Sequence, residues 1–323
     1  MSNQDLSETK QTTVQAPWWY SPAVFGELEL RPSKPLLISA GLRADYFQRL
    51  HEGVVAPRLS VRYDLSPHWA VKGALGMYNQ EPNVEETDHS FGNPNLKAER
   101  AIHAALGAEW RPWPGTSFDA TGFYKRLSNL VSPTDATQIE NGAEVPLNYD
   151  NGGRGRVIGL ELTVRRELCA GFFGWIAYTL SRSERLDSGQ TEWRLFDFDQ
   201  THILAAVASY DLPRHWRIAS RFRYVSGNPE TPVIGSVFNS VTDEYDPVFG
   251  KVNSARQPPF AQLDVRLDKQ WVFDRWLLDA YLDLQNATNH TNPEGIAYNY
   301  DYTQSKVSQG LPILPFLGLR AEF

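Results

Sequence analysis

Three arginines at even spacing are the residues of this chain best suited to bind a ligand. Arg217, Arg221 and Arg223 are four and two positions apart, so in a strand all three would lie on one face. Guanidinium groups that line a narrow channel would attract an anionic ligand. Alternatively the arginines contact a plug inside the channel, or they pair with carboxylates on other strands, such as Asp264, Asp268, Asp279 and Asp283.

Two acidic segments carry groups that can bind metal ions. Asp197, Asp199 and His202 suit metal binding or acid–base work, but they also fit the end of a loop and the start of a strand. The second segment contains Asn83, Glu85, Glu86 and Asp88. Its oxygen ligands are dense enough for calcium, but the spacing and the missing turn glycine do not match the helical calcium loop. A calcium ion in a long loop is therefore the alternative to an ordinary polar loop.

The sequence contains no motif that indicates catalysis or cofactor binding. No nucleophile elbow, phosphate-binding glycine loop or dinucleotide fingerprint stands in a suitable context, so we predict neither an enzyme nor a resident cofactor. The single cysteine, Cys169, cannot form an internal disulfide and falls in a predicted tight turn. The net charge of −7 is spread along the chain without a basic run, which argues against nucleic-acid binding.

The elements that position these residues are two-faced strands. In the last eight residues, Leu317, Leu319, Ala321 and Phe323 alternate with polar or small positions, and the same period of two recurs along the chain. We predict thirteen strands, starting near Ala23, Leu36, Pro57, Trp69, Arg100, Thr116, Arg156, Phe172, His202, Trp216, Phe260, Trp276 and Pro315. Two of them, Glu99–Arg111 and Gln200–Tyr210, are rich in alanine and have a helical alternative.

Three features favour a transmembrane β-barrel over a soluble sandwich. The alternating runs are about ten to twelve residues long, which is enough to cross a bilayer. Tight links such as 66–68 and 212–215 take turns with long polar loops such as 127–153 and 227–259, as in outer-membrane barrels. Aromatic residues gather near strand ends, as in interfacial girdles; they are Tyr46, Tyr63, Trp69, Tyr78, Trp110, Trp216, Tyr224, Trp271 and Trp276.

The amino-terminal segment is polar and has no secretory signal. An odd number of strands that ends on the short-turn side would place the start of the chain in a long-loop region, whereas bacterial barrels have even strand numbers. We therefore expect residues 1–17 to be a polar loop remnant and residues 18–323 to be the carboxy-terminal part of a larger barrel.

Several motifs resemble those of one known family. Residues 93–99, Asn-Pro-Asn-Leu-Lys-Ala-Glu, are similar to the NPNLKPE signature of TonB-dependent outer-membrane receptors, with alanine in place of proline at Ala98. Residues 41–46 (GLRADY), 198–202 (FDQTH), 224–229 (YVSGNP) and 286–289 (NATN) resemble other motifs of that family in the same order. The resemblance covers nearly the whole chain from Ala23 onward, including the terminal Phe323.

The resemblance implies a fold, a location and partners. It implies an all-β barrel of 22 strands, of which this chain supplies about thirteen without the plug domain, in the bacterial outer membrane. Its function would be to bind a scarce solute, with siderophore-iron first among the candidates, and to import it with energy supplied by TonB through an amino-terminal region absent here. The Phe323 end would contact the barrel-assembly machinery, and lipid would surround the barrel. The alternatives are a passive porin-like channel and a soluble all-β carbohydrate-binding domain.

Overall fold

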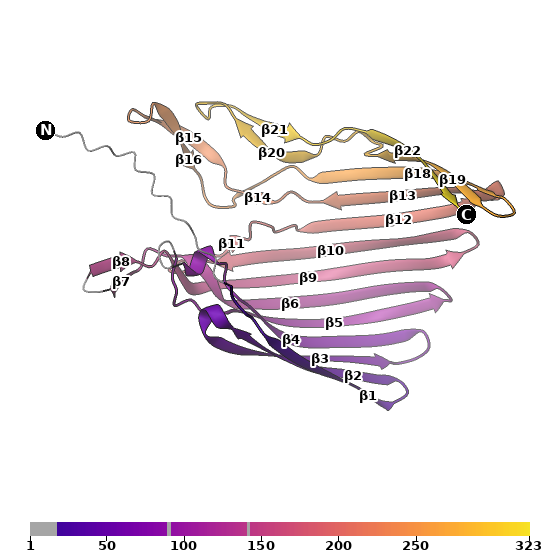
Figure 1. Cartoon of the computed structure of the whole chain (residues 1–323), viewed down its shortest axis with the longest axis horizontal. Helices are drawn as coiled ribbons and strands as arrows, with labels where there is room; N and C mark the ends of the chain where they lie inside the picture. The colour runs from indigo at the N-terminus through magenta and orange to yellow at the C-terminus, as the bar shows by residue number, and fades with distance from the viewer. Residues whose placement is uncertain (1–17, 89–91, 141–142) are drawn as a thin grey trace.

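The computed structural model describes residues 18–88, 92–140 and 143–323, and most of them form one curved antiparallel sheet (Figure 1). Each strand lies beside its predecessor, in the order β1 (Ala23–Ser33), β2 (Leu36–Phe47), β3 (Glu52–Asp64), β4 (Trp69–Gln80), β5 (Glu99–Trp113), β6 (Thr116–Pro133), β9 (Tyr149–Cys169), β10 (Phe172–Leu186), β12 (His202–Leu212), β13 (Trp216–Val225), β18 (Phe260–Val272), β19 (Leu277–Gln285) and β22 (Leu314–Glu322). A short strand, β11 (Arg194–Leu195), also pairs with β10. The all-β antiparallel fold predicted from the sequence is confirmed.

Small sheets and turns fill the connections. Four two-stranded sheets pair β7 (Thr137–Glu140) with β8 (Ala143–Pro146), β14 (Pro229–Glu230) with β17 (Ala255–Arg256), β15 (Val233–Asn239) with β16 (Glu244–Phe249), and β20 (Pro293–Tyr298) with β21 (Ser305–Gln309). The helical turns are η1 (Gln48–Leu50), η2 (Glu85–Thr87) and η3 (Pro213–His215). Among the residues described, no helix is long and apolar enough to span a membrane.

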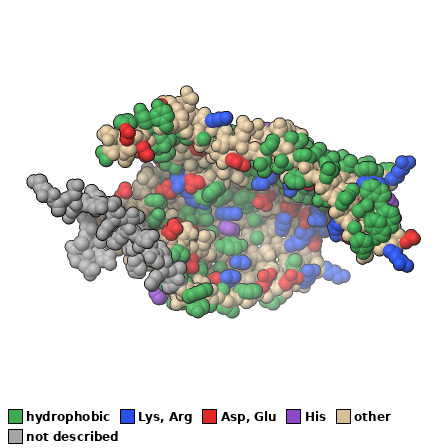
Figure 2. Space-filling model, turned by 45° about the horizontal axis from the view of Figure 1, so that its top comes forward, with side chains coloured by type: hydrophobic (Ala, Val, Ile, Leu, Met, Phe, Trp, Pro, Cys, Tyr) green, Lys and Arg blue, Asp and Glu red, His purple; other side chains and the backbone are tan. Residues whose placement is uncertain are grey.

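The strand register separates an apolar face from a polar face. On β18, Leu267 lies between Ile218 and Leu282, whereas its neighbour Asp268 lies between Arg217 and Tyr281. Large apolar side chains are exposed on the apolar face, among them Leu42, Leu59, Leu75 and Ile176. Figure 2 looks into the hollow of the sheet, where charged side chains of both signs lie. Because the apolar face points outward, the described chain has only one small buried apolar cluster, built on Phe47 and Val54. This is the reverse of a soluble sandwich.

The two ends of the sheet differ in their connections. Tight turns join β1 to β2, β3 to β4, β5 to β6, β9 to β10, β12 to β13 and β18 to β19 at the end that also holds the carboxy-terminus (Figure 1). Cys169 ends β9 at one of these turns, where Ala170 and Gly171 have φ angles of 50° and 81°. The small hairpins lie at the opposite end, so the predicted alternation of short and long connections is confirmed. The β2–β3 connection is the exception, because η1 makes it short at the long-loop end.

The structure corrects several predicted details. The alanine-rich segments are the strands β5 and β12, so their helical alternative is wrong. Strand β9 starts at Tyr149 rather than near Arg156, and β6 continues to Pro133, because irregular pairing around Asn129 (φ 56°) extends the ladder past a break in the alternation. Tyr78 is not part of an outward girdle, since its register places it on the polar face. The loop predicted for residues 1–17 lies outside the described residues.

Candidate functional site

The three predicted arginines do share the polar face of β13. Arg217 lies opposite Asp211 and Asp268, Arg221 lies opposite Asp264, and Arg223 lies opposite Ala205 and Gln262. All three side chains are exposed to the hollow of the sheet. Their shared face follows from the period of two, which the sequence predicts without knowledge of the neighbouring strands.

Two of these arginines are held by carboxylates. Nη2 of Arg221 donates to Oδ2 of Asp264 at 2.6 Å, and the same carboxylate accepts the Asn286 backbone N–H at 2.9 Å. Arg217 donates from Nε to Asp211 at 2.5 Å. The predicted pairing with a carboxylate on another strand therefore holds for Arg221 and Asp264. Arg217 pairs instead with Asp211, which was not among the predicted partners.

Arg223 differs from both neighbours in the row. Its guanidinium carbon lies 5.6 Å from the centre of the Phe260 ring, and within the described part of the chain it makes no ion pair. An exposed arginine beside an aromatic ring can bind an anionic or planar group without first breaking a salt bridge. Within the predicted row, Arg223 is thus the side chain best placed to bind a ligand.

A second basic and aromatic region lies on the polar face of the first strands. A hollow of about 450 Å³ crosses β1 to β6 and reaches β9. Within it Arg58 lies over the Tyr78 ring at 4.8 Å, Tyr78 lies 4.5 Å from the His103 ring, and Lys125 lies 5.5 Å from the Phe123 ring. This hollow cannot be recognised in the sequence, because its lining residues come from β1 to β6 and β9, which are far apart along the chain. The alternation of each strand gave the only available signal.

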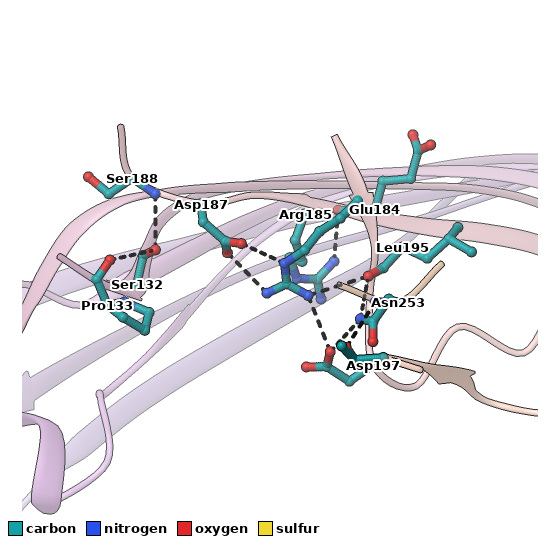
Figure 3. Close-up of polar contacts among 11 residues, drawn as sticks. Ser132, Pro133, Glu184, Arg185, Asp187, Ser188, Leu195, Asp197 and Asn253 are labelled. Carbon is teal, nitrogen blue, oxygen red and sulfur yellow. Dashed lines mark hydrogen bonds and ion pairs between the residues drawn. The ribbon is translucent and has the colours of Figure 1, made fainter. Parts of the chain in front are cut away.

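The long connections at the other end are tied to one another by polar contacts (Figure 3). Arg194 donates to Asp187 at 2.5 Å and to Asp197 at 3.2 Å, and this hydrogen bond to Asp187 raises the pKa of the Arg194 guanidinium above its ordinary value. Asn253, from the β13–β18 connection, donates to the Leu195 carbonyl at 2.8 Å and to Asp197 at 2.6 Å. The β10–β12 and β13–β18 connections are therefore joined through side chains.

Asp199 makes the most buried of these contacts. Its side chain has no exposed area and pairs with Nη2 of Arg256 at 2.5 Å, while its other oxygen accepts the Ser183 N–H at 2.6 Å. His202 is not part of this group, because its Nδ1 lies 2.8 Å from the Tyr178 hydroxyl on the opposite face of the sheet. Asp197, Asp199 and His202 therefore form no metal cluster, and they lie where the alternative placed them, at a loop end and a strand start.

The acidic residues near η2 have local structural partners. Glu85 and Glu86 both lie in η2, and the Glu86 carboxylate accepts the Asn83 backbone N–H at 2.7 Å across the turn. Within the described ranges, no group of three or more histidine, cysteine, aspartate or glutamate side chains is arranged to hold a metal ion.

An aromatic cluster joins the two hairpins at the long-loop end. Phe238 contacts Tyr245 with ring centres 5.2 Å apart, and Tyr245 contacts Tyr300 of the other hairpin at 5.9 Å. The Ser236 hydroxyl also donates to the Asp301 carbonyl at 2.6 Å. A hollow of about 720 Å³ lies beside these rings. Sequence reasoning did not identify the cluster, because Tyr300 lies on a different hairpin from Phe238 and Tyr245, far along the chain.

Together these features define a class of protein. A sheet of long strands with an apolar outer face, a charged inner face, short turns at one end and tied loops at the other is the wall of an outer-membrane β-barrel. The comparison with known families is specific. The family model described as "TonB dependent receptor-like, beta-barrel" matches residues 2–287, and the chain belongs to this family of outer-membrane receptors.

Solved structures share the fold at low sequence identity. The ferric-catecholate import receptor Fiu of Escherichia coli K12 matches with a TM-score of 0.66 and 15% identity over 93% of this chain and 44% of that one. The receptor FpvA of Pseudomonas aeruginosa, bound to pyoverdine, gives 0.66 and 14% over 94% and 42%. The FrpB iron transporter of Neisseria meningitidis gives 0.65 and 17% over 95% and 46%. The chain spans less than half the length of each.

Proposed function

We propose that this chain forms part of the barrel of a receptor that binds a ferric siderophore and imports it with energy supplied through TonB. The observation that carries the proposal is the combination of an exposed arginine row on the polar face with long, joined loops at one end of the sheet. Membership of the receptor family and the named functions of Fiu, FpvA and FrpB support the same solute class.

In this proposal the tied connections form the outer entrance and the arginines lie along the path behind it. A ferric siderophore complex that carries negative charge would be drawn into a hollow lined by guanidinium groups. Arg223 would contact the solute directly, since its side chain is not committed to a carboxylate. Arg221 would mainly hold its strand in place through Asp264, and Arg217 would do so through Asp211.

Iron uptake tests the proposal in cells that lack their own siderophore receptors. The protein, as its cell makes it, is produced in such a strain, and uptake is measured with a panel of ⁵⁵Fe-loaded catecholate, hydroxamate and mixed siderophores. We expect saturable uptake of one class, abolished by deletion of TonB. Equal uptake with and without TonB would instead support the passive channel, and no uptake of any siderophore would reject the solute class.

A variant of Arg223 tests the residue assignment. Loss of one hydrogen bond to a charged group costs about 1.5–3 kcal/mol, so Arg223→Gln should weaken binding of the solute by roughly ten- to a hundredfold. Arg165→Gln is the matched control, because Arg165 is also an exposed arginine on the polar face without an ion pair in the described chain. It lies near the short-turn end, away from the entrance. Equal losses in the two variants would contradict a specific role for Arg223.

A further inference from the structure

Five arginines gather on the outward, apolar face of the sheet, near its long-loop end. The register places each of them on the same face as Tyr124 and Ile158, two or more positions beyond the apolar belt. They are Arg100 on β5, Arg126 on β6, Arg154 and Arg156 on β9, and Arg182 on β10. All five are exposed, and we call this group the outward arginine patch.

The charge of the outward arginine patch is largely unmatched. Arg126 lies directly opposite Arg156 in the β6–β9 ladder, an arrangement of like charges that destabilises a strand pair. Glu184 accepts from Arg156 at 2.6 Å and from Arg182 at 2.8 Å. In the described part of the chain, it is the only carboxylate within ion-pair distance of any of the five. An anion from outside the chain would therefore stabilise the patch.

The level of the patch on the barrel wall indicates where that anion comes from. A tilted strand crosses the hydrocarbon core in about nine to eleven residues, and the outward positions of β9 are aliphatic and exposed from Val164 to Ile158. Arg156 and Arg154 follow directly beyond this point, on the lipid side. The Arg156 guanidinium lies 4.3 Å from the ring centre of Trp193, and tryptophan is enriched at the headgroup level.

The local surface offers room for a headgroup. A hollow of about 540 Å³ is lined by Arg126, Arg154 and Arg156 together with Gly152 and Trp193. The planar fork of each guanidinium matches two oxygens of a phosphate group.

We propose that the outward arginine patch binds the phosphate group of a lipid in the outer leaflet, with Arg126, Arg154 and Arg156 as the direct ligands. A lipid is favoured over free phosphate because the patch faces the bilayer directly above exposed aliphatic side chains such as Ile158 and Leu180. The acyl chains of the bound lipid would cover those side chains. The inference concerns the outside of the barrel and is independent of the solute that passes through it.

Native mass spectrometry of the purified protein tests this site. The protein is extracted from outer membranes as the cell makes it, delipidated in a neutral detergent, and titrated with dioleoyl phosphatidic acid or dioleoyl phosphatidylcholine, which share their acyl chains. We expect at least one phosphatidic acid molecule to be retained at concentrations where phosphatidylcholine is not. Arg126→Gln and Arg154→Gln should each weaken this retention about fivefold, the effect of one arginine near an anionic surface.

Matched variants separate a site from general attraction between charges. Arg165→Gln removes the same charge from the opposite face of β9 and should leave retention unchanged, and Arg126→Lys should keep most of it. Folding is checked for each variant by heat-modifiable migration, and Arg154→Gln decides the question if Arg126→Gln does not fold. Equal retention by wild type and both glutamine variants would overturn the proposal. Release of the lipid by an equal concentration of inorganic phosphate would overturn the assignment to a lipid. The same holds if the glutamine variants lose a copurifying protein while they retain the lipid.

Discussion

Leu267 and Gln270 lie three positions apart on β18, and their side chains meet different surroundings. Leu267 lies between Ile218 and Leu282 on the apolar face, whereas Gln270 lies opposite Asp279 on the polar face. A substitution at one residue therefore has a different consequence from the same substitution at the other, and this difference reports directly which face meets lipid.

We expect Leu267→Arg to lower the free energy of unfolding by roughly 2–4 kcal/mol, the cost of a basic side chain near the bilayer midplane. Gln270→Arg should change it by much less, because the new guanidinium would face Asp279. Gln270 is a cleaner control than Asp268, which already accepts hydrogen bonds from both Nε and Nη2 of Arg266. Refolding of both variants into lipid vesicles with a urea titration measures the difference, and equal losses would contradict the assignment of faces.

Asp199 gives a second test at the scale of one residue. Asp199→Asn keeps the shape of the side chain but leaves the Arg256 guanidinium without its buried counter-charge, and breaking a buried pair is strongly destabilising. We expect faster proteolysis of the β13–β18 connection, measured by limited digestion of the protein in detergent. Glu192→Gln is the control, because the Glu192–Lys251 pair joins the same connections with side chains 75% and 69% exposed, and exposed pairs contribute little. Equal digestion of the two variants would show that Asp199 does not hold the connections together.

The sequence predicts which face each candidate residue occupies but not which partner it meets. Arg217, Arg221 and Arg223 share a face because a strand has a period of two, and this property is local. The choice of Asp264 for Arg221, and the exposed position of Arg223, depend on the offset between β13 and its neighbours. That offset is set by turn geometry and by packing over the whole sheet, and no single strand encodes it.

At the scale of elements, strands were predictable wherever alternation is unbroken. The starts of β1, β2, β4 and β10 agree with the sequence prediction, because a tight turn with glycine or proline precedes or follows each of them. The extension of β6 and β9 toward the long-loop end was not predictable, since bulges around Asn129 interrupt the period of two. The hairpins β15–β16 and β20–β21 were also missed, because their strands are only five to seven residues long and the apolar residues of β15 do not alternate with polar ones.

The native cysteine allows a direct test of which end of the sheet faces outside. Cys169 is exposed at the short-turn end, and Thr242 is exposed in the turn of the β15–β16 hairpin at the long-loop end. On intact cells, a membrane-impermeant maleimide should leave the wild-type protein unlabelled and should label the Thr242→Cys variant. Permeabilised cells should label both. Labelling of Cys169 on intact cells, with Thr242→Cys adding no further signal, would invert the topology.

At the scale of the whole molecule, the sheet has two open edges in the part of the chain that the structure describes. β1 and β22 each pair on one side only, and both run toward the short-turn end. Joining these edges directly would require a parallel seam, and leaving them open would expose unpaired amides and carbonyls to hydrocarbon at several kcal/mol each. The prediction that the chain is part of a larger barrel follows from this geometry and stays a prediction.

We therefore expect residues 1–323, produced alone with an added signal peptide, to form no closed barrel. Such a chain should migrate on detergent gels without the heat-dependent shift of a folded barrel, and it should not restore siderophore uptake in a receptor-deleted strain. The control is an intact outer-membrane barrel produced from the same vector, which must show the shift. A heat-modifiable monomer that restores uptake would prove the prediction wrong.

The contacts that join the β10–β12 and β13–β18 connections also affect the thermodynamics of loop closure. Asn253, Arg256 and Lys251 all reach from one connection to the other, so the two cannot be ordered independently. When one connection becomes ordered around a solute, the other becomes ordered with it, so both lose conformational entropy in the same step. A solute that touches only one of them would quench the motion of the other as well, and its binding would appear as a single cooperative step in hydrogen exchange across both segments.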